Sequence, residues 1–247
     1  MSAKVRLYID TPLQIGADVT LTEAQSHYLC RVMKLGEGDA FIGFDGVSGE
    51  YDITITKVLK KYCQASVGNL LRPMSQSPDI WLLFAPVKKE QTDYIVQKSV
   101  ELGVRVLQPV ITNRTNSEKV RRDRLIAQGI EASEQCRRLD IPKVEDAQPL
   151  EKILQNWDSS RKLFYMDETR QGRPVSEAFK NASAPAAILV GPEGGFSDKE
   201  LTLLRQLNFA YGVTLGPRIL RAETAVAAAL SCWQALSGDW INYTEQK

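Results

Sequence analysis

Two short stretches near the C-terminus contain residue types that could bind a small-molecule ligand. Residues 189–200 read Leu-Val-Gly-Pro-Glu-Gly-Gly-Phe-Ser-Asp-Lys-Glu, and residues 215–225 read Leu-Gly-Pro-Arg-Ile-Leu-Arg-Ala-Glu-Thr-Ala. Each stretch follows a short apolar run and leads into a helix-like pattern, so each predicts a turn from a strand to a helix. Ligands bind at such turns in open α/β sheets, and the pair therefore predicts a pocket.

The first of these loops could bring a ligand close to the main chain. Gly191, Gly194 and Gly195 allow backbone conformations that other residues avoid. Ser197 and Glu200 have the spacing of a capping box, which places the start of a helix beside the loop. The loop matches neither the P-loop nor the G-x-G-x-x-G fingerprint, so a triphosphate or a dinucleotide is not indicated. Taken alone, the loop could also be an ordinary glycine turn.

The second loop adds charged and hydroxyl side chains together with an apolar wall for a flat ring: Arg218, Ile219, Leu220, Arg221, Glu223 and Thr224. Glu223 and Thr224 could instead stabilise the first turn of the last helix through its dipole. Arg221 is poorly explained in that way, because a cation at a helix start opposes the dipole. Arg221 is therefore the better functional candidate.

A third group of interest is basic and lies between residues 88 and 138: Lys88, Lys89, Lys98, Arg114, Lys119, Arg121, Arg122, Arg124, Arg137 and Arg138. Acidic neighbours dilute this charge, so a solvated helix face and a phosphate-binding surface both remain open. Arg114 follows a predicted strand directly and is the best placed of the group to touch a ligand.

Composition limits the class of protein. The net charge of the 247-residue chain is +1 and the pI is near 7.6, so no overall basic field indicates a nucleic-acid partner. The four cysteines lack C-x-x-C spacing, which favours reduced thiols and no zinc knuckle. We expect a soluble cytoplasmic protein without a membrane segment, because no signal-like start or long apolar run occurs. We interpret the single histidine, His27, as structural and expect no metal.

Residues 1–72 predict a small barrel-like β domain. Short β-rich runs separated by turn residues predict strands at 5–9, 40–44, 51–56 and 64–67, with one helix over 22–33. Residues 73–79 have the composition of a linker, with two prolines and small polar residues.

Residues 80–247 predict an α/β domain, because strands alternate with longer helices. We expect strands at 80–87, 104–111, 163–166, 186–190 and 211–215, and helices at 89–102, 120–138, 197–206 and 222–236. This alternation predicts a mainly parallel sheet with helices on both faces. The last helix is apolar or small on nearly every side and must be buried all round, either in one core or in a core combined with a subunit interface. Apart from the strand at 163–166, residues 142–181 show no clear pattern.

The two C-terminal motifs resemble those of the trefoil-knotted SPOUT methyltransferases, specifically the bacterial ribosomal RNA small subunit methyltransferase E family. The likeness extends over most of the chain. Residues 6–8 and 27–39 look like that family's PUA-like RNA-binding domain, and Lys88, Lys89, Arg114 and residues 97–103 and 131–136 resemble its middle motifs. A departure is Arg137, which stands where relatives often carry glycine.

The resemblance implies a knotted, mainly parallel sheet with helices on both faces, preceded by a small PUA-like β-barrel. It implies methylation of N3 of a uridine in 16S ribosomal RNA with S-adenosylmethionine, on the small ribosomal subunit, by a homodimer with its active site near the subunit interface. The residues implied to hold S-adenosylmethionine, largely through backbone groups, are Leu189, Gly191, Glu193, Gly194, Gly195, Leu215, Gly216, Ile219, Leu220 and Thr224.

The same resemblance suggests roles in catalysis and in RNA binding. Arg221 or Arg114 could stabilise the developing uracil anion, and Glu223 could accept the proton. The residues expected to bind RNA are Arg6, Lys88, Lys89, Arg114, Arg122 and Arg138. Two other functions remain open: a non-catalytic RNA-binding or ribosome-assembly factor, and a nucleotide-dependent transferase, which the missing phosphate-loop fingerprints disfavour.

Overall fold

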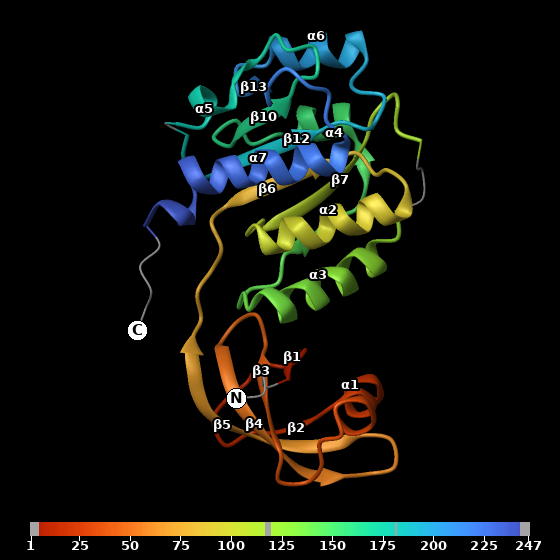
Figure 1. The fold of residues 1–247 in the computed structure, drawn as a ribbon, viewed down its shortest axis with the longest axis vertical. Helices are drawn as coiled ribbons and strands as arrows, with labels where there is room; N and C mark the ends of the chain where they lie inside the picture. Colours follow the sequence, from red (N-terminus) through yellow and green to blue (C-terminus); the bar gives the residue numbers. More distant parts are fainter. Residues whose placement is uncertain (1–4, 117–119, 181, 243–247) are drawn as a thin grey trace. The chain divides into compact units, whose positions relative to one another are not determined.

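The chain divides into two compact units. The computed structural model describes residues 5–116, 120–180 and 182–242 (Figure 1). Unit 1 contains Met1–Gln76 and Ser133–Ile141, and unit 2 contains Ser77–Ala132 and Pro142–Lys247. The sequence pattern gave no sign that residues 133–141 belong with the N-terminal unit.

Unit 1 is built on a five-stranded sheet with the order β1-β3-β4-β5-β2. The pairing of β1 with β3 is parallel, and the other pairings are antiparallel. The strands are β1 (Arg6–Tyr8), β2 (Asp18–Thr20), β3 (Ala40–Phe44), β4 (Gly49–Val58) and β5 (Cys63–Pro73). Alternate residues of β3, β4 and β5 point into one core, where Phe41, Ile53 and Ala65 are fully buried.

The helix of unit 1 is shorter than the sequence predicts. A capping box formed by Thr22 and Gln25 starts α1 (Glu23–His27), and the chain then continues as one π-helical segment, η1 (Tyr28–Val32). Within this segment Leu29 is fully buried in the core, whereas Val32 is exposed.

Unit 2 contains a mainly parallel sheet with the order β11-β13-β10-β12-β6-β7-β8, and β9 pairs with β7. All pairings among these described strands are parallel. The strands are β6 (Ile80–Phe84), β7 (Val106–Ile111), β8 (Lys143–Val144), β9 (Gln148–Pro149), β10 (Lys162–Met166), β11 (Arg173–Pro174), β12 (Ala186–Val190) and β13 (Ala210–Thr214). The predicted fold class is confirmed.

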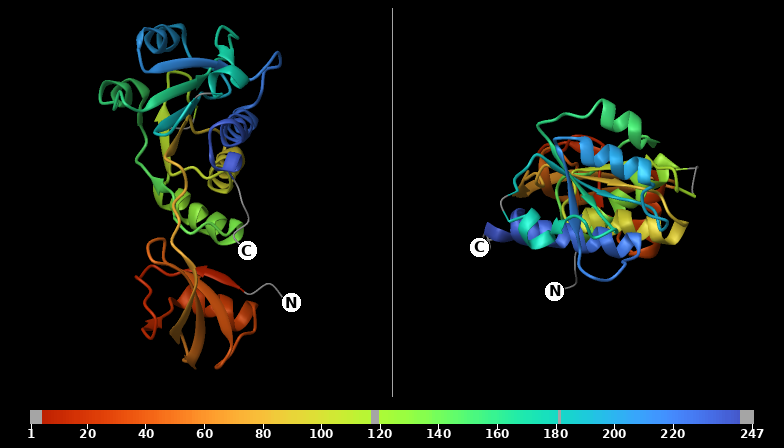
Figure 2. Two further views of the ribbon diagram at one scale, coloured as in Figure 1. Left: turned by 90° about the vertical axis from the view of Figure 1, so that its left-hand side faces the viewer. Right: turned by 90° about the horizontal axis from the view of Figure 1, so that it is seen from above.

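Helices cover both faces of this sheet (Figure 2). Leu82 and Phe84 of β6 point into the core that includes α2 and α7, whereas Leu83 points into the core that includes α4 and α6. The helices are α2 (Lys89–Glu101), α3 (Arg122–Cys136), α4 (Leu150–Gln155), α5 (Val175–Ala178), α6 (Asp198–Gln206) and α7 (Ala222–Leu236), followed by the 3-10 segment η2 (Asp239–Asn242). None of the described helices has the length and apolarity needed to span a membrane.

The last helix, α7, is not buried all round within one chain, so of the two alternatives burial in a single core is wrong, and a core combined with a subunit interface stays a prediction. One side of α7 is buried and consists of residues that recur at helical spacing: 222, 225, 226, 229, 230 and 233. The helix lies beside α2 (Figure 1). Thr224 and Ala235, on the opposite side, are exposed. The helix therefore presents a second, partly open side made of small residues.

Candidate functional site

The carboxyl ends of three neighbouring strands form a cavity of about 260 Å³. The strands have the spatial order β13-β10-β12, so the loops that follow them meet at one edge of the sheet. The lining consists of residues 166–168 and 170 after β10, residues 190–195 after β12, residues 213–216 and 218–220 after β13, and Ala222 and Ala225 of α7. This is the edge at which parallel α/β sheets bind ligands.

The glycines of the loop after β12 are required by close packing. A Cβ atom at Gly191 would lie 3.2 Å from ring carbons of Phe196. Gly195 has a φ of 69°, and a Cβ there would collide with the carboxylate of Glu168. The amide of Gly195 also donates to the carbonyl of Pro192 over 2.9 Å. The backbone of this loop therefore lines the cavity without intervening side chains at these positions.

The predicted capping box at the start of α6 is present. Ser197 Oγ accepts from the amide of Glu200, and Glu200 Oε2 accepts from the amide of Ser197 over 2.8 Å. Glu200 is buried, and its Oε1 also accepts from the amide of Asn113 over 2.9 Å. The capping box thus ties the loop after β7 to the glycine loop, and it uses two amides that would otherwise be free.

Arg114 lies against the outside of the glycine loop. Its Nη1 donates to the carbonyl of Gly194 over 2.8 Å, and its side-chain carbons lie 3.4 to 4.0 Å from where a Cβ of Gly194 would be. Arg114 is exposed but does not line the cavity. One of its nitrogens is therefore already used to hold the loop.

The loop after β13 supplies the apolar wall predicted from the sequence. Leu215, Gly216, Ile219 and Leu220 all line the cavity. Ile219 is 87% exposed, which is the highest exposure among the large hydrophobic side chains of the described residues. Arg218 also lines the cavity, and its guanidinium has no hydrogen bond or ion pair with any described residue.

Arg221 and Glu223, on either side of Ala222 at the start of α7, are not part of the cavity lining. Arg221 is the N-cap residue and is exposed, and Glu223 is half-buried. In the described part of the chain, neither side chain has a polar partner. Thr224 is exposed on the open side of α7, and Leu189 is fully buried in the core on the α6 side of the sheet. The other eight residues predicted to hold the cofactor line the cavity: Gly191, Glu193, Gly194, Gly195, Leu215, Gly216, Ile219 and Leu220.

The loop after β10 was missed by the sequence analysis. Asp167, Glu168 and Arg170 all line the cavity. Asp167 is buried and accepts from Thr169 Oγ1 over 2.6 Å. Burial of Tyr165, together with the charge of Asp167, raises the pKa of Tyr165. The sequence did contain a signal for this part of the site, because two carboxylates, Asp167 and Glu168, directly follow the predicted strand 163–166. Nothing in the sequence placed this strand between the other two.

Two of the residues predicted to bind RNA lie free at the start of α2. Lys88 and Lys89 are exposed and have no polar partner among the residues that the structure describes. Lys89 lines a second cavity, of about 360 Å³, together with Arg121 and Arg124. Arg122 is partly engaged, because its Nε donates to the carbonyl of Val144 over 2.7 Å.

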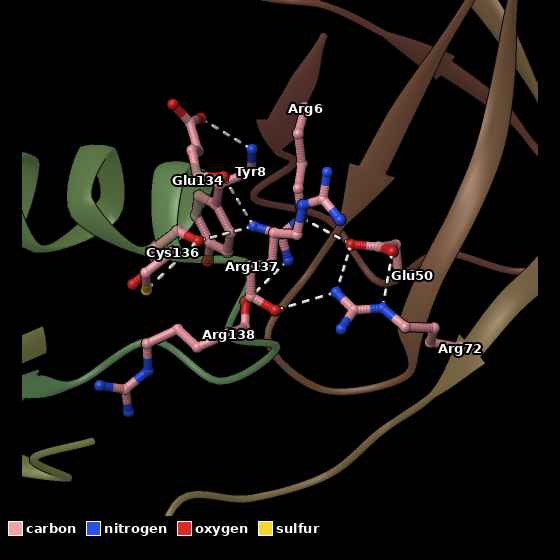
Figure 3. A network of polar contacts seen from close by, with 9 residues as sticks. Arg6, Tyr8, Glu50, Arg72, Glu134, Cys136, Arg137 and Arg138 are labelled. Atoms are coloured by element: carbon pink, nitrogen blue, oxygen red, sulfur yellow. Dashed lines mark hydrogen bonds and ion pairs between the residues drawn. The ribbon is translucent and has the colours of Figure 1, made fainter. Parts of the chain in front are cut away.

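Arg6 has an internal role in unit 1. Its side chain is 7% exposed, its Nε donates to Glu50 Oε2 over 2.5 Å, and its guanidinium lies 3.6 Å from the ring centre of Phe44. Its other nitrogens donate to the carbonyls of Ser133 and Arg138, each over 2.7 Å (Figure 3). All three nitrogens of Arg6 are therefore used inside unit 1, which gives it a structural role, and its contact with RNA stays a prediction.

Glu50 is the centre of this network. Arg72 donates to both of its carboxylate oxygens over 2.8 Å, and Arg6 donates to one of them. Burial alone would raise the pKa of Glu50, but the hydrogen bonds from Arg72 and Arg6 outweigh burial and hold that pKa below its usual value. Arg138 is 7% exposed and pairs with Asp140 over 2.6 Å, and its contact with RNA likewise stays a prediction.

No cluster of three or more His, Cys, Asp or Glu side chains suited to a metal ion occurs among the described residues. The cavity instead offers backbone groups, apolar side chains, carboxylates and arginines. This lining suits an organic ligand with a flat ring and several hydrogen-bonding groups.

Comparison with protein families gives two matches. Residues 75–234 match the RNA methyltransferase domain family, and residues 21–68 match the RNA methyltransferase PUA domain family. A similar protein is the ribosomal RNA small subunit methyltransferase E of Synechocystis sp., with 33% identity over 94% of this chain and 77% of the relative.

Two solved structures are similar over nearly the whole chain. One is a putative methyltransferase from Legionella pneumophila in complex with S-adenosylmethionine, with 30% identity and a TM-score of 0.86 over 96% of this chain and 99% of that one. The other is the ribosomal RNA small subunit methyltransferase E of Neisseria gonorrhoeae bound to S-adenosylmethionine, with 29% identity, a TM-score of 0.86 and the same coverage.

Proposed function

Because the chain belongs to the ribosomal RNA small subunit methyltransferase E family, we propose that it transfers the methyl group of S-adenosylmethionine to N3 of one uridine in 16S ribosomal RNA. Family membership itself gives the coarser statement that the chain is an S-adenosylmethionine-dependent ribosomal RNA methyltransferase. The finer proposal includes action on the small ribosomal subunit in the cytoplasm. The observation that supports it best is a cavity at the carboxyl edge of the sheet with an unpaired arginine beside it.

The cavity fits S-adenosylmethionine in size and lining. Its volume of about 260 Å³ is close to the lower end, about 300 Å³, of small-molecule sites. Val213, Leu215 and Leu220 offer apolar surface for the adenine ring, and the glycines expose backbone groups. A side chain at Gly195 would fill part of the space. When bound, S-adenosylmethionine supplies a methyl group that is already activated by its sulfonium, so the protein mainly has to position the reactants.

Stabilisation of the uracil anion is the main chemical task left to the chain. N3 of uracil carries a proton, and negative charge develops on the ring as this proton leaves. Arg221 suits this task because its guanidinium is exposed, unpaired among the described residues and adjacent to Ala222 of the cavity lining. Arg114 is the second choice, since one of its nitrogens already holds Gly194. Glu223 is the proposed proton acceptor.

The RNA strand is proposed to run along the same edge of the sheet. β6 is the neighbour of β12, so the loop that carries Lys88 opens beside the glycine loop. Lys89, Arg121 and Arg124 around the second cavity could then contact backbone phosphates. In this proposal Arg114, which already contacts the glycine loop, is a further RNA contact.

The open side of α7 supports the proposed homodimer. Thr224, Ala228, Ser231 and Ala235 lie on this side at helical spacing, and their small side chains allow a second helix to approach closely. The substitution Ala228→Glu should convert a dimer to a monomer in sedimentation equilibrium, because it places a charge in the contact.

The test of the reaction uses small ribosomal subunits from cells that lack this protein. Incubation with the purified chain and S-adenosylmethionine should produce N3-methyluridine, detected by mass spectrometry of nucleosides. Arg221→Ala should slow the transfer about 100-fold while changing the affinity for S-adenosylhomocysteine less than about threefold. Arg173→Ala, an exposed arginine of β11, is the matched control and should keep full activity.

Two results would contradict the proposal. Methylation at another atom would refute the N3 assignment while leaving the chain a methyltransferase. RNA binding without any transfer would favour the non-catalytic assembly factor instead.

A further inference from the structure

The loop after β10 connects the two other loops of the cavity. β10 lies between β12 and β13 in the sheet, so its carboxyl end opens at the middle of the cavity. Glu168 Oε1 accepts from the amide of Phe196 over 2.9 Å, in the loop after β12. Arg170 Nη1 donates to the carbonyl of Pro217 over 3.4 Å, in the loop after β13. This loop therefore positions both walls of the cavity.

Two carboxylates that line the cavity, Asp167 and Glu168, differ in how many of their oxygens already have a partner. Asp167 is buried, its Oδ1 accepts from Thr169, and its Oδ2 lies 3.6 Å from Arg205. Both carboxylate oxygens of Asp167 thus already have partners within the described chain. Glu168 is exposed to the cavity, and only its Oε1 has a partner among the described residues.

The loop after β12 is shaped to accept this carboxylate. Gly195 faces Glu168 so closely that a Cβ atom would collide with it, and the φ of Gly195 is 69°. The amide of Phe196, directly after Gly195, fixes one carboxylate oxygen. The other oxygen, Oε2, belongs to a residue that lines the cavity, and it has no donor in the described chain.

We infer that Glu168 Oε2 accepts hydrogen bonds from the ribose hydroxyls of the methyl donor, an inference that rests on the proposed function. The ribose is the middle part of S-adenosylmethionine, between the adenine and the amino-acid chain, and Glu168 lines the cavity from the loop whose strand lies between β12 and β13. Acidic side chains near strand ends bind ribose hydroxyls in other α/β proteins. Glu168 is a binding residue here and has no part in moving the methyl group or the proton.

The test compares two small probes that lack the amino-acid chain. 5′-Methylthioadenosine carries both ribose hydroxyls, and its 2′-deoxy form lacks one. Titration calorimetry should give the wild-type chain an affinity about tenfold higher for the ribose form, as expected for a charge-assisted hydrogen bond. In Glu168→Gln this preference should fall to about threefold or less, because the neutral amide is a weaker acceptor.

Glu168→Gln keeps an oxygen that can accept from the amide of Phe196, so the loop should keep its position. Glu177→Gln, an exposed glutamate of α5, is the matched control and should leave both affinities unchanged. S-adenosylhomocysteine is the third probe, and its affinity should fall in Glu168→Gln by the same factor as that of 5′-methylthioadenosine.

Three outcomes would overturn the inference. An unchanged preference for the ribose form in Glu168→Gln would mean that the carboxylate only positions the loop. A loss confined to S-adenosylhomocysteine would mean that Glu168 meets the amino group instead of the ribose. Failure of the wild-type chain to bind any of the three probes would refute the methyl donor itself and with it the proposed function.

Discussion

Charged side chains serve different purposes in the two units. In unit 1, Arg6 and Glu50 are each 7% exposed and hydrogen-bond to one another and to neighbouring groups. In unit 2, Lys88 and Arg221 are exposed, and no described residue pairs with them. The same residue types therefore stabilise the fold in one region and are available to a ligand in the other. The two sets of charged side chains differ in burial and in the number of hydrogen-bonding partners. Neither property can be predicted from residue type.

The difference also concerns free energy. A buried ion pair gains little over an apolar replacement, but removal of one partner leaves an uncompensated charge and costs several kcal/mol. An exposed, unpaired cation loses little stability when it is removed, and its removal affects binding instead. The two regions should therefore respond to substitution in opposite ways.

The largest effect on stability is expected for Glu50→Gln in unit 1. The substitution leaves the buried guanidinium of Arg6 without its counter-charge, so the free energy of unfolding should fall by about 3 to 5 kcal/mol. Chemical denaturation followed by circular dichroism measures this change. Glu23→Gln is the control, because Glu23 and Lys61 are each 70% exposed and lie 4.0 Å apart; it should cost less than about 1 kcal/mol. Equal costs for the two variants would contradict the role given to the buried network.

The next largest effect is expected for Gly195→Ala in the cavity. The added Cβ would push the carboxylate of Glu168 aside and the φ of 69° is unfavourable for alanine, so affinity for S-adenosylhomocysteine should fall about tenfold. Gly216→Ala is the matched control, because Gly216 also has a positive φ, of 106°, but no atom lies within 4 Å of its added Cβ. Calorimetry should show a clearly smaller loss for Gly216→Ala. Similar losses would mean that backbone strain alone, and not the contact with Glu168, decides the shape of the loop.

A smaller effect is expected for Lys89→Ala at the proposed RNA surface. Loss of one phosphate contact should weaken RNA binding by about 1 kcal/mol and lower the slope of log affinity against log salt by about 1. Filter binding at several salt concentrations gives both values. Lys162→Ala is the control, because Lys162 is exposed at the first residue of β10, at the opposite edge of the sheet. If both variants lowered the slope equally, the carboxyl edge would not be the RNA surface.

The smallest effect is expected from mild acid on unit 1. The pKa of Glu50 is lowered in the folded chain, so the unfolded chain binds the proton more tightly. This contribution to stability is fully present above the unfolded-state value, about 4.3, and is lost as the pH falls through the lowered folded-state pKa. The difference in melting temperature between wild type and Glu50→Gln should therefore stay constant from pH 7 to about pH 5 and shrink in stronger acid. A difference that grew on acidification would contradict the assignment.

Much of the architecture followed from local pattern. The helix over residues 222–236 was predicted with its observed bounds, and the Ser197 and Glu200 capping box was predicted from spacing alone. Both depend on residues close together in the chain. The strands β8, β9 and β11 were not predicted, because two residues carry no periodicity.

The sequence by itself determined that two glycine- and arginine-bearing turns follow buried strands, because strand periodicity, glycine and capping residues act over a few positions. Only the tertiary structure decided that β10 lies between these strands and brings Glu168 into the lining of the cavity. It also decided that Arg6 is buried against Glu50 and the segment 133–141, more than 120 residues away in the chain. The order of strands and the pairing of charges depend on contacts between distant residues, and a local pattern does not contain them.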